Sequence, residues 1–271
     1  MAIRIMFFWK AHYSMLSFID THCHLDAAEF NGERNDLVRN AQAAGVHTLV
    51  IPSIEHANFE PIKILCLKYP NCVAAYGIHP LYTDRAMPSD LDALRGFLSQ
   101  TAVAVGEIGL DFFVENYNQT VQEFYFSEQL KLAHEFDLPV LLHSRRAVDR
   151  VLKYLRQIKV RGGIAHAFNG SKQQAAEFIK LGFKLGFGGA MTYSRATRLR
   201  ELATVLPLDS LVLETDAPDI PPDFLERGLP NKPEYLPRIA QTLAALRCIP
   251  LEEIAQVITA NTRAVLPKLN F

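Results

Sequence analysis

Short segments that are apolar throughout alternate with longer amphipathic segments along most of the chain. The short segments lack the two-residue alternation of a half-exposed strand, and continuous apolar strands are typical of parallel sheets covered on both faces. We therefore predict parallel strands at residues 17–22, 46–52, 73–78, 102–107, 139–143, 162–166, 183–188 and 211–216.

The amphipathic segments between these strands predict helices. The clearest extends from Thr120 to Phe136, where Phe124, Leu130 and Phe136 form a helix-like pattern among glutamine, glutamate and lysine. Other helices are predicted near residues 33–44, 57–68, 90–99, 145–157, 171–181, 195–205 and 232–247, with a further one near 250–263.

Eight strand–helix units predict an α/β protein with a (β/α)8 TIM barrel and an extra C-terminal helix. The alternative is a doubly wound sheet, but no glycine-rich dinucleotide fingerprint follows the first predicted strand. We expect one barrel domain over residues 17–271. Because Met15 lies just before the first strand, residues 1–16 are predicted to be a disordered leader or a misassigned start.

The composition of the chain excludes several classes of function. The chain has 271 residues, a net charge of −1 and a pI near 6.8, so no strong basic field is available for tight non-specific binding of duplex DNA. No segment approaches the roughly 18 apolar residues of a membrane span. The four cysteines show no C-x-x-C spacing and are predicted to be reduced thiols of a cytoplasmic protein. We expect no membrane association and no obligate protein partner.

Two histidines stand one residue apart in F-I-D-T-H-C-H-L-D, at the end of the first predicted strand. Residues i and i+2 of a strand point to the same side, so His22 and His24 share a side and Cys23 faces away. Two neutral imidazoles that converge can hold a divalent metal ion. An H-x-H pair by itself is more often ordinary polar structure, so other residues must decide.

Further polar residues fall at the carboxyl ends of predicted strands, where a barrel places its active site. They are His79, Glu107, His143, His166 and Asp216. Each has an ordinary explanation alone, such as a satisfied histidine, a glutamate paired with arginine or a helix-capping aspartate. Together with His22 and His24, however, they would compete for partners at one rim in the absence of a cation. The set therefore predicts a metal site.

Imidazole and carboxylate ligands together suit a pair of divalent ions, Mg²⁺, Mn²⁺ or Zn²⁺. Glu107 lies between the other ligands in strand order, so its two oxygens could bridge both ions. Paired ions clamp the attacking and leaving oxygens of a displacement and lower the pKa of a bound water, which indicates hydrolysis. Asp216 could bind an ion and accept the proton of that water.

The chain resembles the TatD-type metal-dependent hydrolases of the amidohydrolase superfamily. The resemblance rests on six motifs in order, F-I-D-T-H-C-H-L-D, G-I-H-P, V-G-E-I-G-L-D, P-V-L-L-H-S-R-R, H-A-F-N-G-S and L-V-L-E-T-D-A-P-D, and extends from about Phe18 to the N-T-R segment at Asn261–Arg263. It implies that His22, His24 and Asp216 bind one metal ion, that His143 and His166 bind the second, and that Glu107 bridges them. Asp216 and Glu107 are thereby the implied catalytic residues.

The same resemblance implies a DNA phosphodiester as substrate, since members studied as nucleases cut DNA with Mg²⁺ or Mn²⁺ and often trim single strands from the 3′ end. Two regions depart from the family pattern. Residues 1–16 lie outside it, and the usual Arg-Asn-x-Pro segment after the last strand is replaced by L-P-N-K-P, with Leu229 and Pro230 before Asn231.

Further residues are candidates for substrate binding. His79 could contact a phosphate or a further metal ion, or could be a hydrogen-bonded turn histidine before Pro80. Arg145 and Arg146 could hold a phosphate bidentately or could pair with neighbouring carboxylates.

Two other groups have similar alternatives. The aromatic residues Phe112, Phe113 and Tyr193 could stack bases or pack the barrel mouth. The segment Asn169–Ser171 could bind an anion at a helix start or simply cap that helix.

We therefore interpret the chain as a divalent-metal-dependent hydrolase, most simply a deoxyribonuclease that trims single-stranded DNA in the 3′–5′ direction. The alternative is hydrolysis of a small amide, ester or lactone on the same metals. A third hypothesis, a binding protein that has lost catalysis, is disfavoured because all six implied ligands are present.

Overall fold

The structure is a computed structural model that describes residues 16–269. The predicted leader therefore lies almost entirely outside the described residues. Two compact units are distinguished by their internal packing. Unit 1 comprises the described residues up to Val50 together with Phe187–Thr262, and unit 2 comprises Ile51–Gly186 and the residues from Arg263 onward. The prediction of a single domain over residues 17–271 stays a prediction.

The described residues contain eight strands, all predicted from the sequence. They are β1 (Phe18–Asp20), β2 (Val46–Pro52), β3 (Cys72–Tyr76), β4 (Ala104–Asp111), β5 (Val140–Arg145), β6 (Gly163–Ala165), β7 (Phe183–Phe187) and β8 (Leu211–Leu213). Their order in the sheet is the order of the chain, β1 to β8, and the recorded pairs are parallel.

Helices separate the strands, as the amphipathic segments predict. They are α2 (Arg34–Ala43), α3 (Phe59–Lys68), α4 (Pro88–Leu98), α5 (Gln119–Glu135), α6 (Val148–Gln157), α7 (Lys172–Lys180), α8 (Thr197–Val205), α9 (Leu236–Arg247) and α10 (Leu251–Val265). Strictly alternating strands and helices with sequential strand order confirm the (β/α)8 fold class, and α10 is the predicted extra helix.

Several strand ends differ from the prediction, and those next to the candidate site residues matter most. β5 continues to Arg145, so His143 lies inside it, and β6 ends at Ala165, so His166 follows it. β1 ends at Asp20 and β8 at Leu213, so His22, His24 and Asp216 lie in the segments that follow these strands. In contrast, β4 continues to Asp111, so Glu107 lies inside the strand and not at its end. Glu107 looks like a polar end in the sequence, but the strand stays buried along its whole length.

Pairing with β5 explains why β4 is longer than predicted. Gly109 lies opposite His143, and Asp111 lies opposite Arg145. A Cβ atom at Gly109, whose φ is +152°, would come within 1.9 Å of the His143 carbonyl oxygen. Glycine at this position therefore allows the two strands to remain paired up to the candidate site residues.

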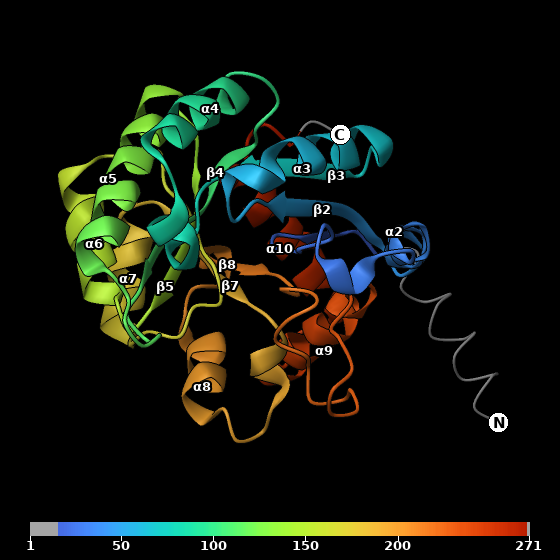
Figure 1. Cartoon of the computed structure of the whole chain (residues 1–271). Helices are drawn as coiled ribbons and strands as arrows, with labels where there is room; N and C mark the ends of the chain where they lie inside the picture. The colour runs from blue at the N-terminus through green and yellow to red at the C-terminus, as the bar shows by residue number, and fades with distance from the viewer. Residues whose placement is uncertain (1–15, 270–271) are drawn as a thin grey trace. The chain divides into compact units, whose positions relative to one another are not determined.

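Helix α5 holds the end of β4 and the segment that follows β3 through two buried glutamines. The Gln122 side chain accepts a hydrogen bond from the Asp111 N–H (2.9 Å) and donates one to the Asp111 carbonyl (3.0 Å). Gln129 does the same for Ile78, at 2.6 and 3.1 Å. Figure 1 shows α5 alongside β4 in unit 2. Because buried backbone groups need partners, these amides hold the strand ends in place.

Helix α10 performs a comparable role in unit 1. The Asn261 amide donates to the carbonyls of Leu208 and Leu211, both at 2.8 Å, and the Thr259 hydroxyl donates to the Ser17 carbonyl at 2.7 Å. The extra helix therefore anchors the residues that enter β1 and β8. The asparagine of the N-T-R segment, Asn261, is therefore a structural residue, and Thr262 beside it donates within the helix to the Ile258 carbonyl at 2.9 Å.

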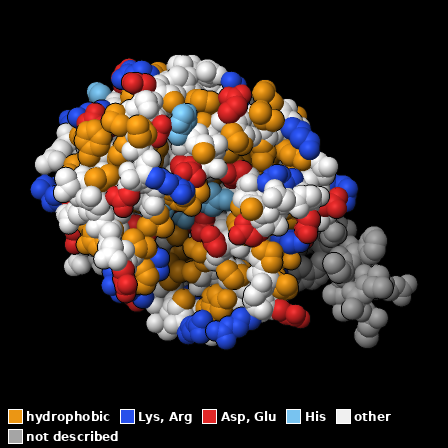
Figure 2. Space-filling model, in the orientation of Figure 1, with side chains coloured by type: hydrophobic (Ala, Val, Ile, Leu, Met, Phe, Trp, Pro, Cys, Tyr) orange, Lys and Arg blue, Asp and Glu red, His pale blue; other side chains and the backbone are white. Residues whose placement is uncertain are grey.

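Three further findings concern the described residues. Among the described residues, no helix is both long and apolar enough to cross a membrane. No disulfide bond links the four cysteines, all of which lie in the described part of the chain. On the face shown in Figure 2, basic and acidic side chains are interspersed, which agrees with the near-neutral net charge.

The Glu123 carboxylate on α5 links this helix to α6. It accepts hydrogen bonds from Arg150 Nε at 2.7 Å and from the Tyr154 hydroxyl at 2.8 Å. Partial burial raises the pKa of Glu123, but hydrogen bonds from Arg150, Gln119 and Tyr154 outweigh it and lower the pKa from 4.5 to about 2. The depressed pKa means that the contact stabilises the fold above pH 4.5 and is lost as the pH falls from 4.5 towards 2.

We expect Arg150→Ala to lower the thermal unfolding midpoint at pH 7, and we expect its difference from wild type to shrink through the acid range. Unfolding followed by circular dichroism at a series of pH values tests this. Arg39→Ala, which removes an exposed pair within α2, serves as the control. A difference that is constant with pH would show that Arg150 acts through packing alone.

Candidate active site

The first pair of histidines continues the direction of β1 in unit 1. The Cys23 N–H donates to the Val50 carbonyl at 3.0 Å, and the His24 N–H donates to the Ala217 carbonyl at 2.8 Å. Cys23 is fully buried, and the Nε2 atoms of His22 and His24 lie 3.3 Å apart. The i, i+2 spacing thus brings both imidazoles to one side, as predicted.

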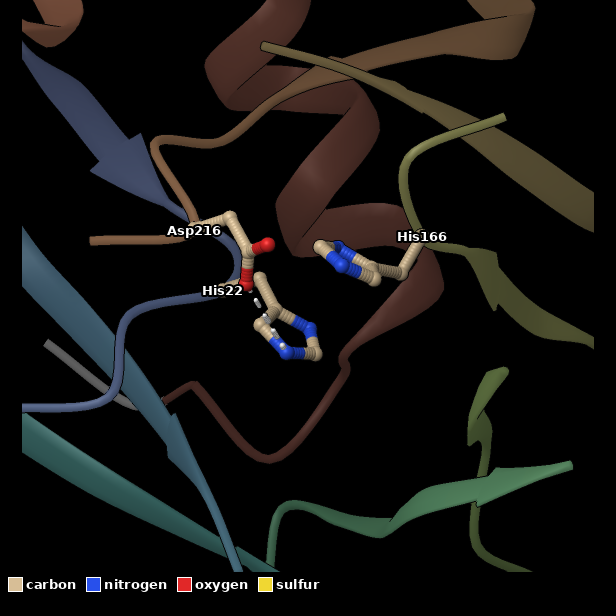
Figure 3. A group of neighbouring side chains, drawn as sticks. All are labelled: His22, His166 and Asp216. Atoms are coloured by element: carbon tan, nitrogen blue, oxygen red, sulfur yellow. Dashed lines mark ion pairs between the residues drawn. The ribbon is translucent and has the colours of Figure 1, made fainter. Parts of the chain in front are cut away.

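Asp216 meets both imidazoles from the segment after β8. Its Oδ1 atom lies 3.7 Å from Nε2 of His22 and 3.7 Å from Nε2 of His24. Figure 3 shows the His22 imidazole and the Asp216 carboxylate directed towards one another, with His166 drawn at the end of β6. Three potential ligand atoms therefore converge within unit 1.

The backbone holds Asp216 in an uncommon conformation. Its φ is +60°, which is unfavourable for a residue with a side chain, and its N–H donates to the His22 carbonyl at 2.9 Å. The Asp219 N–H closes a turn onto the Asp216 carbonyl at 2.7 Å. Strained backbone that neighbouring hydrogen bonds enforce is typical of functional positions.

Asp20 supports this cluster from beneath. Its carboxylate accepts hydrogen bonds from the Thr215 hydroxyl (2.5 Å) and N–H (2.9 Å) and from the His22 N–H (3.3 Å). Burial raises the pKa of Asp20 to about 7, although these hydrogen bonds oppose the increase. Asp20 therefore connects the residues that follow β1 with those that follow β8.

Asn231, in the L-P-N-K-P segment, also has a structural role. It is fully buried, and its amide nitrogen donates to the carbonyls of Thr215 (2.7 Å) and Ile220 (3.2 Å). Its own N–H donates to the Pro218 carbonyl at 2.9 Å. This segment keeps its asparagine to hold the Asp216 turn, even though Leu229 and Pro230 replace the usual preceding residues.

A second cluster lies within unit 2. Glu107 is buried on β4, and its Oε1 atom lies 3.0 Å from Nδ1 of His143 on β5. Nε2 of His143 lies 2.9 Å from Oδ2 of Asp111. Both imidazole nitrogens therefore face carboxylates, and Nδ1 is the one that faces the implied bridging ligand.

His79 follows β3, as predicted, and His166 follows β6, which ends one residue earlier than predicted. Nδ1 of His79 accepts a hydrogen bond from the Leu81 N–H at 3.2 Å, and Nε2 lies 3.7 Å from Oε1 of Glu107. Ligand atoms of His79, Glu107 and His143 lie within 4.8 Å of one another. His79 is thus a turn histidine whose second nitrogen also reaches this cluster. His166 is held by its N–H, which donates to the Leu142 carbonyl at 3.0 Å.

Opposite charges dominate the electrostatics of the second cluster. Burial lowers the pKa of His143, but its hydrogen bonds to Asp111 and Glu107 outweigh this and raise the pKa above its ordinary value. Burial raises the pKa of Asp111, yet hydrogen bonds from His143 and the Phe113 N–H lower it overall. The cluster therefore favours positive charge between its two carboxylates.

The donor chemistry of both clusters fits divalent metal ions. Two imidazoles and a carboxylate converge in unit 1, and two imidazoles converge on a carboxylate in unit 2. Nitrogen and oxygen donors in this combination suit Zn²⁺ and Mn²⁺, and the carboxylates also suit Mg²⁺.

Asp111 is a site residue that the sequence reasoning missed. A signal was available, because Asp111 follows Glu107 by four residues in G-E-I-G-L-D, and residues i and i+4 of a strand share a face. Its carboxylate faces Nε2 of His143, which leaves Nδ1 as the nitrogen that can bind a metal ion. Carboxylates that hold the outer nitrogen of a ligating histidine orient the ring and increase its basicity.

We expect Asp111→Asn to lower the affinity for Mn²⁺ by about 10- to 100-fold. The amide cannot supply the negative charge that stabilises the His143 ring in its ligating orientation. Titration calorimetry with Mn²⁺ measures the effect, with Asp92→Asn on the exposed face of α4 as the matched control. Wild-type affinity in the Asp111 variant would refute a positioning role.

The remaining candidates for substrate binding have the following contacts. Arg145 and Arg146 lie at the end of β5, and their guanidinium groups pack on Phe113. Phe112 stacks on Tyr117, with ring centroids 4.9 Å apart, and the Tyr193 hydroxyl donates to the Pro221 carbonyl at 3.1 Å.

Ser171 caps α7 by accepting a hydrogen bond from the Gln174 N–H at 3.2 Å, so capping explains this helix start.

Comparison with known proteins places this chain in a family. Residues 19–267 match the sequence profile of a family described as TatD related DNase. An uncharacterized metal-dependent hydrolase of Escherichia coli K12, YjjV, is 43% identical over 249 residues, which cover 90% of this chain and 96% of the relative. A crystal structure of the E. coli YjjV protein, described as a TatD homologue, superposes with a TM-score of 0.89 at 41% identity and covers 92% of this chain and 98% of the other.

One similar protein carries a more specific name. The Klebsiella pneumoniae protein named 3′-5′ ssDNA/RNA exonuclease TatD is 32% identical over 253 residues, which cover 91% of this chain and 96% of the relative. The resemblance inferred from the six sequence motifs is therefore confirmed.

Proposed function

This chain belongs to the TatD family of metal-dependent hydrolases, and from this premise we propose that it is a nuclease that hydrolyses phosphodiester bonds of single-stranded DNA in the 3′–5′ direction. The name of the Klebsiella relative and the description of the family support this substrate class. In this chain the proposal rests on the exposure and the contacts of Arg145 and Arg146.

Arg145 and Arg146 are exposed at the end of β5, and each packs its guanidinium group on an aromatic ring. Within residues 16–269 neither guanidinium group forms an ion pair with a carboxylate, and the charge of Arg145 helps to lower the pKa of Asp111. Two exposed guanidinium groups that follow His143 and form no ion pair within the described residues suit a phosphodiester anion. A neutral amide or ester gives them no comparable role.

For the metal centre we propose the ligand set that the family resemblance implies. His22, His24 and Asp216 would hold one divalent ion, His143 and His166 the second, and Glu107 both. Mg²⁺, Mn²⁺ and Zn²⁺ all agree with these donors. Bound in this way, the ions supply charge for the phosphoryl oxygens and lower the pKa of the attacking water.

The side chains perform the remaining steps. Asp216 accepts the proton of the attacking water, and its strained backbone fixes the direction of its carboxylate. Asp111 holds the His143 ring, and the turn of His79 keeps Nε2 of that residue directed towards Glu107. We propose that Arg145, Arg146 and His79 contact the substrate phosphates.

Cleavage of 5′-labelled single-stranded DNA with Mg²⁺ or Mn²⁺, in the presence and absence of a chelator, tests the proposal. Metal-dependent shortening with a ladder that begins at the 3′ end is the expected result. If protein that carries two metal ions leaves the DNA intact, the nuclease function is wrong. An ester, amide and lactone panel then tests the alternative substrate classes.

A further inference from the structure

Phe113 is an exposed aromatic residue at the carboxyl end of β4. About 44% of its surface is accessible, although a phenyl ring usually contributes to stability by being buried. Its backbone is not loose, because its N–H donates to Oδ1 of Asp111 at 2.9 Å. The Asp111 carboxylate that contacts His143 therefore also fixes the backbone of Phe113.

Two guanidinium groups pack on this ring. The central carbon of Arg145 lies 3.6 Å from the Phe113 centroid, and that of Arg146 lies 4.6 Å from it. Arg146 reaches the ring from a left-handed backbone conformation, with φ at +55°. Within the described residues the Phe113 ring is the packing partner of both cations, and neither forms an ion pair, although the charge of Arg145 helps to lower the pKa of the Asp111 carboxylate.

Strand register places this arrangement beside the second cluster. Arg145 lies opposite Asp111, and the Phe112 N–H donates to the Arg145 carbonyl at 2.9 Å. Arg145 follows His143 by two residues on β5, so both side chains leave the strand on the same side. The three residues Phe113, Arg145 and Arg146, which we call the platform, therefore adjoin residues implied in hydrolysis.

The platform combines two kinds of chemistry that a nucleotide needs. The flat surfaces of an aromatic ring and of a guanidinium group accept a stacked base, and the N–H edges of the arginines bind the phosphate. A phosphate ester without a base would use only the arginines. Bases in a duplex are already stacked and paired, so only an unpaired base can lie on such a surface.

We propose that the platform is a nucleotide subsite, on which one base of a single-stranded nucleic acid stacks while Arg145 and Arg146 hold the adjacent phosphate. This inference rests on the proposed nuclease function and extends it. It assigns selectivity for nucleotides, and for single strands over duplexes, to three residues of this chain.

An abasic substitution separates base stacking from phosphate binding. Short single-stranded DNAs carry one abasic residue at each of the 3′-terminal positions in turn, and KM and kcat are measured for each. At one position the wild type is expected to show a KM increase of about 5- to 150-fold, with little change in kcat. Phe113→Ala should raise KM for intact DNA by a similar factor and should no longer distinguish abasic from intact DNA at that position.

Three further variants make the result specific. Phe113→Trp keeps a stacking surface and should retain the discrimination. Phe124→Ala removes an equally exposed phenyl ring from α5 and should leave all constants near wild type. Arg146→Lys keeps the charge without the planar group and should weaken binding of intact and abasic DNA alike.

The possible results separate a failure of the platform from a failure of the proposed nuclease function. If Phe113→Ala cleaves DNA but still discriminates against the abasic position, or if the wild type never discriminates, the platform is only a surface contact. If the metal-loaded wild type cleaves no DNA, fluorescence anisotropy of the same labelled DNAs measures their binding directly. In that case equal affinity for intact and abasic DNA overturns the proposal, and a base-dependent affinity that Phe113→Ala abolishes supports it.

Discussion

Replacing Glu107 by alanine is expected to abolish hydrolysis, with a fall on the order of 10³-fold or more. Glu107 is the implied ligand of both metal ions, it is buried on β4, and its Oε1 atom lies 3.0 Å from His143. Its loss removes a negative charge from the centre of the second cluster and leaves His143 with Asp111 alone. Both metal ions should therefore be lost, together with the activity.

Metal content after chelation and reloading, measured by mass spectrometry beside DNA cleavage, tests this expectation. Glu107→Gln is the second variant, because it keeps the size of the side chain and preserves the packing around β4. His47→Ala, exposed on β2, is the control and should retain near wild-type activity. Retention of two metal ions by Glu107→Ala would show that the bridging assignment is wrong.

Asp216→Asn is expected to lower kcat by about 10²- to 10⁴-fold, the range for loss of a general base. Asparagine preserves the shape of the side chain, and the turn formed by the Asp216 N–H and carbonyl does not involve the carboxylate. The variant therefore loses the proton acceptor and one anionic ligand of the proposed metal site, while keeping the fold of unit 1.

Steady-state kinetics on single-stranded DNA measure this effect, and thermal unfolding shows that the variant is folded. Asp219→Asn, three residues further along the same turn, is the comparison for a general change of charge. A kcat within a few-fold of wild type in Asp216→Asn would remove Asp216 from the proton-transfer role and leave it at most as a metal ligand.

The sequence by itself predicted the fold class, since apolar strands and amphipathic helices have local periodicities that do not depend on tertiary contacts. It also predicted polar residues near the carboxyl ends of strands, although Glu107 lies inside β4 and His143 inside β5. His22 and His24 are the clearest example, since their two-residue spacing alone placed both imidazoles on one side.

Strand lengths and the supporting residues depended on tertiary structure. From the sequence, the fourth strand was predicted to end at Glu107. In the structure the pairing of Gly109 with His143 extends it to Asp111. The contact between Asp111 and His143 joins residues that are 32 positions apart, and no local pattern encodes it. The role of Asn231 in holding the Asp216 turn likewise depends on the return of a distant loop.

For Arg145 and Arg146, too, the sequence determined their position and the tertiary structure determined their partners. Their place after His143 is visible in P-V-L-L-H-S-R-R, but the sequence left a phosphate and a protein carboxylate as equal alternatives for them. Tertiary packing places Phe113 beneath both guanidinium groups and no ion-paired carboxylate beside them within residues 16–269. The residue types and their order thus follow from local sequence, whereas the partner of each charged side chain follows from the register of strands distant in the chain.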